Sequence, residues 1–215
     1  SQVAVFQYEG ICSITESAET VDYIAMADAL KALHLFQGSD TGYGNGYNLD
    51  RYPTRLQALV MFLRVLGEED AALAYTGSHP FTDVPWGDSY VAYAYSKGYT
   101  NGYGDGRFGS DNPVSAASYV EFLLRALGYS TAGVDDWRTS LTRAVGCGLI
   151  TDGERQALES GEFYRAQVVY LSYRSLDAPV SGTAEQLGDR LVRQGLFTAS
   201  QLQAARSGVS PVRLG

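Results

Sequence analysis

Apolar residues recur every three or four positions between Leu56 and Leu66, which is the spacing of one face of an α-helix. Thr54 stands just before this stripe and Gln57 three residues later, so the two residues form a capping-box pattern at a helix start. Gly67 follows the stripe, at a place where a helix-ending glycine is favoured. The pattern predicts a helix between Thr54 and Gly67.

An earlier apolar stripe predicts another helix before this one. Ser13 and Glu16 form a capping-box pattern at its beginning. The stripe itself consists of Val21, Ile24, Leu30 and Leu33. Residues 38–47 are rich in Gly, Asn and Tyr and predict a loop, because each glycine inside a helix costs about 1 kcal/mol. Residues 3–8 alone are compatible with a short strand, so the chain is predicted to be mainly all-α.

This helix-loop-helix pattern occurs three times. The sequence Gly-Tyr-Gly-Asn-Gly at residues 42–46 recurs as Gly-Tyr-Gly-Asp-Gly at residues 102–106, and Leu-Arg-Val-Leu-Gly at 63–67 recurs as Leu-Arg-Ala-Leu-Gly at 124–128. A third, more diverged copy repeats four residues of the first at a constant offset. Arg55, Gln57, Arg64 and Leu66 correspond to Arg165, Gln167, Arg174 and Leu176. The chain is therefore predicted to be a tandem repeat.

The second and third copies are expected to fold like the first. In the second copy we expect a short helix over 89–97, a glycine loop over 98–109 and a helix over 115–128. In the third copy we expect a helix from Trp137 to about Gly146, a shortened loop over 148–153 and a helix from Tyr164. Two short helices, over 183–194 and 200–206, are expected to pack against the last copy. The predicted units are an N-terminal segment (1–13), three repeats (14–67, 79–128 and 134–177) and a helical extension (183–215).

Composition and charge argue against several kinds of partner. The net charge of -8 disfavours binding to nucleic acid or to anionic lipid. No apolar run approaches the roughly 18 residues that cross a membrane as a helix. The spacing of Cys12 and Cys147 rules out a Cys-x-x-Cys motif, and leaves open whether they form a disulfide or are two small apolar residues.

Arg55 is the most informative charged residue. A cation at a helix start is mildly unfavourable, because the positive end of the helix dipole lies there. The placement makes sense as an anion site, where the guanidinium joins the free backbone N–H groups of the first turn. Arg165 occupies the equivalent position in the third copy, whereas Ala116 follows Ser115 in the second. The alternative is that both arginines are ordinary surface residues.

The chain's two tryptophans have acidic neighbours in the sequence. Asp83 precedes Trp86, and Asp136, with Asp135, precedes Trp137. An exposed indole beside a carboxylate suits sugar binding, since the ring stacks on the sugar and the acid accepts hydrogen bonds from its hydroxyls. The alternative is that each indole is an apolar plug between copies.

Motifs for cofactors, metals and nucleophilic catalysis fail on spacing. The glycine runs are G-x-G-x-G rather than the dinucleotide fingerprint G-x-G-x-x-G. Residues 101–112 faintly resemble a calcium loop, but Tyr103 stands where a third-position acid is needed and Asn112 replaces the bidentate glutamate. Neither histidine is paired with a nucleophile. We therefore expect no cofactor, no metal and no enzyme activity, although a pair of hydrolytic carboxylates can form in three dimensions without any sequence signature.

The second copy resembles the S-layer homology motif. The resemblance rests on Phe-Thr-Asp-Val-Pro-Trp at 81–86, on the glycine-rich stretch 98–108 and on Asp-Asn-Pro at 111–113. Residues 53–57 and 164–167 are similar to the Thr-Arg-Ala-Glu signature of that family. The resemblance implies a pseudo-threefold spindle with a central three-helix bundle, followed here by a C-terminal helical hairpin. It also implies non-covalent anchoring to a secondary cell-wall polysaccharide, often pyruvylated, outside the cell.

The resemblance implies grooves between neighbouring copies. The main groove would contain Arg55, Asp83 and Trp86, with the backbone of the glycine loop beside them; its further members are Thr54, Gln57, Gly102, Tyr103 and Gly104. The groove of Arg165 and Gln167 lacks an aromatic platform, because the first copy has no Phe-x-Asp-Val and Trp sequence at its start. The groove of Asp136 and Trp137 lacks the signature arginine of the second copy. We therefore expect one competent groove.

Three functions remain open on the sequence alone. The first is a wall-anchoring module that binds an acidic sugar and is compatible with self-association in a surface lattice. The second is a degenerate module whose partner is protein, such as a second copy of the chain. The third is a hydrolase, which requires two carboxylates within about 10 Å of each other in one cleft.

Overall fold

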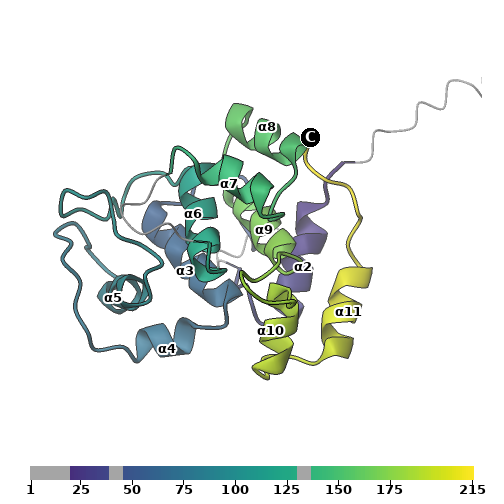
Figure 1. The fold of residues 1–215 in the computed structure, drawn as a ribbon, viewed down its shortest axis with the longest axis horizontal. Helices are drawn as coiled ribbons and strands as arrows, with labels where there is room; N and C mark the ends of the chain where they lie inside the picture. The colour runs from purple at the N-terminus through teal and green to yellow at the C-terminus, as the bar shows by residue number, and fades with distance from the viewer. Residues whose placement is uncertain (1–19, 39–45, 130–136) are drawn as a thin grey trace, which may run out of the picture.

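The computed structural model describes residues 20–38, 46–129 and 137–215, and all regular elements in these ranges are helices (Figure 1). They are α2 (Tyr23–Ala32), α3 (Arg55–Val65), α4 (Glu69–Leu73), α5 (Asp88–Ser96), α6 (Ala116–Ala126), α7 (Ser140–Gly146), α8 (Asp152–Ser160), α9 (Arg165–Ser175), α10 (Leu187–Arg193) and α11 (Ala199–Ser207). The predicted all-α class is confirmed. The Ser13–Glu16 capping box and the strand over 3–8 lie outside the described residues.

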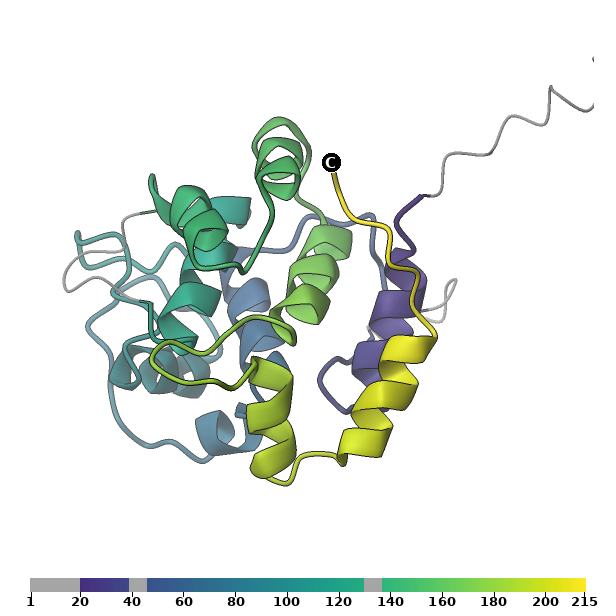
Figure 2. The same cartoon turned by 45° about the vertical axis from the view of Figure 1, so that its right-hand side comes forward.

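Helices α3, α6 and α9, the second helices of the three copies, pack against one another at the centre (Figure 2). Phe62 on α3 lies 5.5 Å from Phe122 on α6, measured between ring centroids. Tyr119 on α6 is fully buried, and its hydroxyl lies 2.6 Å from that of Ser172 on α9. These contacts join the three copies in one hydrophobic core.

The first helix of each copy packs against the second helix of another copy. Helix α5 of the second copy contacts α3 of the first, α7 of the third contacts α6 of the second, and α2 of the first contacts α9 of the third. Each copy therefore buries its apolar face against its neighbours rather than within itself. This is the order of contacts that the expected spindle requires, and its threefold symmetry stays a prediction.

The first helices of the three copies, α2, α5 and α7, end in the same way. A residue with positive φ follows each helix: His34 (60°), Gly98 (72°) and Gly148 (80°). The next residue then donates its N–H back to the helix, as in Leu35 to Leu30 and Tyr99 to Ala94. A left-handed residue in this place closes the helix by satisfying its last carbonyls.

Several predicted boundaries were wrong for local reasons. The shortened loop predicted over 148–153 ends at Thr151, because Thr151 and Glu154 form a capping box that starts α8 at Asp152. The helix predicted to begin at Trp137 begins at Ser140, so Trp137 lies before α7. The first helix of the extension begins at Leu187 instead of Thr183. Residues before it form a turn, in which Val180 N–H donates to the carbonyl of Glu185.

The C-terminal extension packs more widely than expected. Helix α11 lies beside α2 of the first copy in both views (Figures 1 and 2). Gly188 N–H donates to the carbonyl of Leu176 in the third copy, and Leu196 fills the space beside Gly67 in the first. The extension therefore bridges the first and third copies. Ile24 was placed in the buried stripe of α2, but half of its surface (49%) is exposed.

Candidate functional site

The start of α3 forms as the sequence predicts, but its N–H groups are already used. Thr54 Oγ1 accepts the N–H of Gln57 at 3.1 Å, and Gln57 Oε1 accepts the N–H of Thr54 at 3.0 Å. The N–H of Arg55 donates to the carbonyl of Asn112 at 2.8 Å, and the N–H of Leu56 donates to that of Ser110 at 3.2 Å. The expectation that free N–H groups here hold an anion was wrong, because the loop of the second copy caps this helix.

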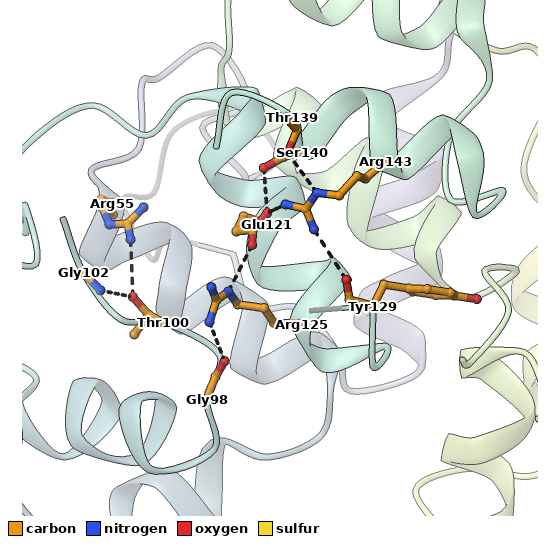
Figure 3. Close-up of polar contacts among 10 residues, drawn as sticks. All are labelled: Arg55, Gly98, Thr100, Gly102, Glu121, Arg125, Tyr129, Thr139, Ser140 and Arg143. Atoms are coloured by element: carbon orange, nitrogen blue, oxygen red, sulfur yellow. Dashed lines mark hydrogen bonds and ion pairs between the residues drawn. The ribbon is translucent and has the colours of Figure 1, made fainter. Parts of the chain in front are cut away.

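The Arg55 side chain is not an ordinary surface group. Only 3% of the residue is exposed, and its Nη2 donates to Thr100 Oγ1 at 3.4 Å (Figure 3). Its guanidinium carbon lies 4.9, 4.8 and 4.9 Å from the ring centroids of three aromatic residues, which are Tyr103, Phe108 and Phe122. Phe108 and Phe122 are fully buried, whereas Tyr103 is 40% exposed. Of the three rings around the guanidinium, that of Tyr103 is therefore the one in contact with solvent.

Glycine at two loop positions allows this arrangement. A Cβ on Gly102 would lie 2.4 Å from the Phe81 ring and 2.6 Å from the carbonyl oxygen of Arg107. A Cβ on Gly109 would lie 2.3 Å from the Tyr103 ring. Both glycines also have positive φ, which side chains disfavour. Gly104, by contrast, has no neighbouring atom within 4 Å of a built Cβ, so its backbone faces open space.

Asp83 organises the same loop. Its two carboxylate oxygens accept the N–H groups of Phe108 at 2.7 Å and of Gly109 at 2.8 Å. Burial alone raises the pKa of Asp83, but these backbone hydrogen bonds outweigh burial and lower the pKa. Asp83 therefore holds Phe108 beneath Arg55, a role that sequence reasoning did not assign to it.

Replacing Asp83 with asparagine is expected to destabilise the fold in a pH-dependent way. Because the folded-state pKa of Asp83 is depressed, its contribution is present above the unfolded-state pKa of about 3.9 and is lost as pH falls through the folded value. Urea unfolding of both proteins should show a gap in free energy that is constant near neutral pH and shrinks below about pH 4. A gap that stays the same throughout the acid range would contradict this role.

Both tryptophans are exposed, so neither is a buried plug. Trp86 is 46% exposed and Trp137 is 50% exposed. Next to Trp86, a Cβ built on Gly87 lies 3.5 Å from the Leu56 side chain, so the turn at Trp86 lies against the start of α3. Arg55, the glycine loop and the turn at Trp86 therefore meet where the first two copies join. We call this place the first junction.

The junction between the third and first copies is built in a similar way. The N–H groups of Arg165 and Ala166 donate to the carbonyls of Arg51 and Leu49, at 2.8 and 3.0 Å. Arg165 Nε donates to the carbonyl of Tyr47 at 3.0 Å. Burial lowers the pKa of this half-buried guanidinium, and nearby Arg64 adds to the lowering.

Gln167 and a hollow complete this junction. Gln167 Oε1 accepts the N–H of Tyr164 at 2.7 Å, and its Nε2 donates to the Tyr23 hydroxyl at 3.4 Å. A hollow of about 570 Å³ lies nearby, lined by residues 20–24, Leu49 and Ser210. Tyr52 and Tyr164 lie together at the start of α9. This junction therefore has aromatic side chains, which the sequence did not predict.

The junction between the second and third copies contains a buried acid and has no arginine at the start of its central helix. Glu121, which is 2% exposed on α6, accepts hydrogen bonds from Arg125 Nε at 3.1 Å, from Ser140 Oγ at 2.7 Å and from Arg143 (Figure 3). Sequence reasoning missed this network. Asp135 and Asp136 lie outside the described residues, and the position of Arg55 is taken by Ala116.

Neither a membrane helix nor a metal cluster occurs in the described part of the chain. No helix there is long and apolar enough to cross a bilayer. Within the same residues, no three His, Cys, Asp or Glu side chains lie close enough to hold a metal ion. Cys12, and with it the question of a disulfide to Cys147, lies outside the described ranges.

Comparison with known proteins identifies the class to which this architecture belongs. Residues 80–124 match the family model of the S-layer homology domain, so the chain contains such a domain. A cell surface protein of Thermoanaerobacter kivui is 30% identical over 188 residues, which cover 83% of this chain and 23% of that protein. A middle cell wall protein of Brevibacillus brevis is 30% identical over 140 residues, covering 63% and 13% of the two chains.

A surface layer protein of Brevibacillus choshinensis is also similar, at 30% identity over 131 residues, covering 59% of this chain and 12% of that one. The chain thus spans a quarter or less of the length of these relatives. The domain match and the relatives together indicate an extracellular location at the bacterial cell wall.

Proposed function

We propose that this chain anchors a surface protein non-covalently to the bacterial cell wall by binding an acidic, pyruvylated secondary wall polysaccharide at the first junction. The observation that carries the proposal is the guanidinium of Arg55, held within 5 Å of three aromatic rings at the junction that also includes the turn of the exposed Trp86. The glycine loop and the turn at Trp86 both lie within the segment that matches the S-layer homology domain. The proposed role requires no catalytic step.

The first junction offers each contact that such a sugar needs. A carboxylate on the sugar matches the planar fork of Arg55. The apolar face of the sugar ring stacks on the indole of Trp86. Gly104 has no side chain to block the approach of the sugar to the backbone.

Tyr103 controls access to the arginine. Its ring covers the guanidinium, so the sugar carboxylate binds as this ring moves aside. Its half-exposed position on a glycine-rich loop makes that movement easier than displacement of the buried Phe108 or Phe122. Arg55 is buried, and a charged hydrogen bond formed in such a low-dielectric environment is stronger than one in water.

The other two junctions are weaker candidates for an acidic sugar. The first copy has no tryptophan in its sequence, so the junction at Arg165 lacks the indole that Trp86 provides at the first junction. The junction near Trp137 has Ala116 at the helix start and the buried carboxylate of Glu121 in the same helix. We therefore assign acidic-sugar binding to the first junction.

Sedimentation with purified wall sacculi tests this proposal. The wild-type protein should sediment with intact sacculi and stay in solution once the secondary polymer has been stripped from them. Trp86→Ala should weaken sedimentation by about tenfold, the upper end of a single aromatic contact of 0.5–1.5 kcal/mol. Trp137→Ala, which removes an equally exposed indole, is the matched control and should sediment like the wild type.

Equal sedimentation with stripped and intact sacculi would contradict the proposal. Self-association that does not depend on the polymer would then favour a protein–protein module.

A further inference from the structure

Tyr52 and Tyr164 form an exposed aromatic pair between the first and third copies. Their ring centroids lie 4.5 Å apart with a tilt of 37°, and Tyr52 is 53% exposed. The Tyr52 hydroxyl donates to Glu162 Oε2 at 2.6 Å and lies 3.3 Å from the Tyr164 hydroxyl. One edge of the pair thus carries two hydroxyls and a carboxylate, while a ring face remains open to solvent. We call these three residues the tyrosine platform.

The backbone fixes the tyrosine platform in place. Tyr164 is the N-cap residue of α9, and its N–H donates to Gln167 Oε1 at 2.7 Å. Tyr52 follows Arg51, whose carbonyl accepts the N–H of Arg165 at 2.8 Å. Two residues 112 positions apart are therefore held side by side by the start of a central helix, with little conformational freedom to lose on binding.

Helix formation does not explain Tyr164. N-cap positions favour Ser, Thr, Asp or Asn, and Thr54 and Ser115 stand at the corresponding positions of the other copies. Tyrosine at this position gives up that preference and places a ring against Tyr52. Burial does not explain the pair either, since more than half of Tyr52 stays in contact with solvent.

We propose that the tyrosine platform binds an uncharged N-acetylhexosamine and so forms a second carbohydrate site, which differs in charge from the first junction. The sugar's C–H face stacks on the Tyr52 ring, and its hydroxyl or amide N–H groups donate to Glu162. The carboxylate of Glu162 repels an acidic sugar, so the platform selects against the group that Arg55 accepts. As a second contact on the same wall polymer, the platform rests on the proposed function, and it raises the avidity of anchoring.

Titration with an uncharged trisaccharide of N-acetylglucosamine tests the tyrosine platform. Tyr52→Ala should weaken binding of this probe at least tenfold, whereas Tyr52→Phe, which keeps the ring, should weaken it only a few-fold. Glu162→Gln should weaken it several-fold. Tyr95→Ala is the matched control, because Tyr95 is also exposed (39%) but packs edge-on against Phe81 rather than against a second tyrosine.

The inference is overturned if the wild type does not bind the trisaccharide, or if Tyr52→Ala binds it as well as the wild type does. Substitution of Arg55 should leave trisaccharide binding unchanged while lowering the affinity for the pyruvylated polymer about ten- to a hundredfold. If substitution of Arg55 weakens polymer binding but Tyr52→Ala leaves trisaccharide binding unchanged, the platform alone is refuted. If Tyr52→Ala weakens trisaccharide binding but substitution of Arg55 leaves polymer binding unchanged, the first junction alone is refuted.

Discussion

Arg55→Met is expected to lower the affinity for the pyruvylated wall polymer by about ten- to a hundredfold, because a hydrogen bond to a charged group contributes about 1.5–3 kcal/mol. Methionine is the appropriate replacement, since Arg55 is buried among three rings and alanine would leave a cavity there. The flexible thioether fills the space and packs well against aromatic rings. Affinity is measured by titrating soluble polymer fragments into the folded variant.

Ser115→Ala is the control for this experiment. Ser115 caps α6, where the equivalent of Arg55 is Ala116. Loss of this cap should cost about 1 kcal/mol of stability and leave polymer binding unchanged. Full binding by a folded Arg55→Met protein would show that the guanidinium does not contact the polymer.

Glu121→Ala is expected to lower the free energy of unfolding by about 3–5 kcal/mol, the cost of removing one partner from a buried ion pair. The carboxylate is 2% exposed and contacts Arg125 and Arg143, so its removal takes away the acid that both guanidiniums share. It also removes the acceptor of the buried Ser140 hydroxyl. Urea unfolding followed by circular dichroism measures the change.

Asp105→Ala is the matched control for Glu121→Ala. It breaks the ion pair with Arg107, in which both side chains are about half exposed or more, and it should leave the unfolding midpoint nearly unchanged. If Glu121→Ala unfolds at the same urea concentration as the wild type, the buried network does not hold the second and third copies together.

The sequence predicted the central helices well because each carries its own signals. Thr54 and Gln57 form the predicted capping box, and α3 begins at Arg55 as expected. The order of packing was not readable in the same way. An apolar stripe shows that a helix face is buried but not which helix covers it, so the contact of α5 with α3 appeared only in three dimensions.

The candidate site stays a prediction, and the sequence did not reveal its detail. The burial of Arg55 depends on how the glycine loop closes through backbone hydrogen bonds to Asp83. Glu121 did leave a signal, because it is the one charged residue within the apolar stretch 119–124 of α6. Tyr52 and Tyr164 left none, since no spacing rule relates two residues so far apart in the chain.

The most direct test of the first junction uses the chain's two indole N–H groups. Heteronuclear NMR spectra, recorded while a pyruvylated polymer fragment is added, follow Trp86 and Trp137 as separate signals. The account predicts that the Trp86 indole signal shifts progressively and that the same fragment without its pyruvate shifts it much less. The account is contradicted if the Trp86 signal stays still, or if only the Trp137 signal moves.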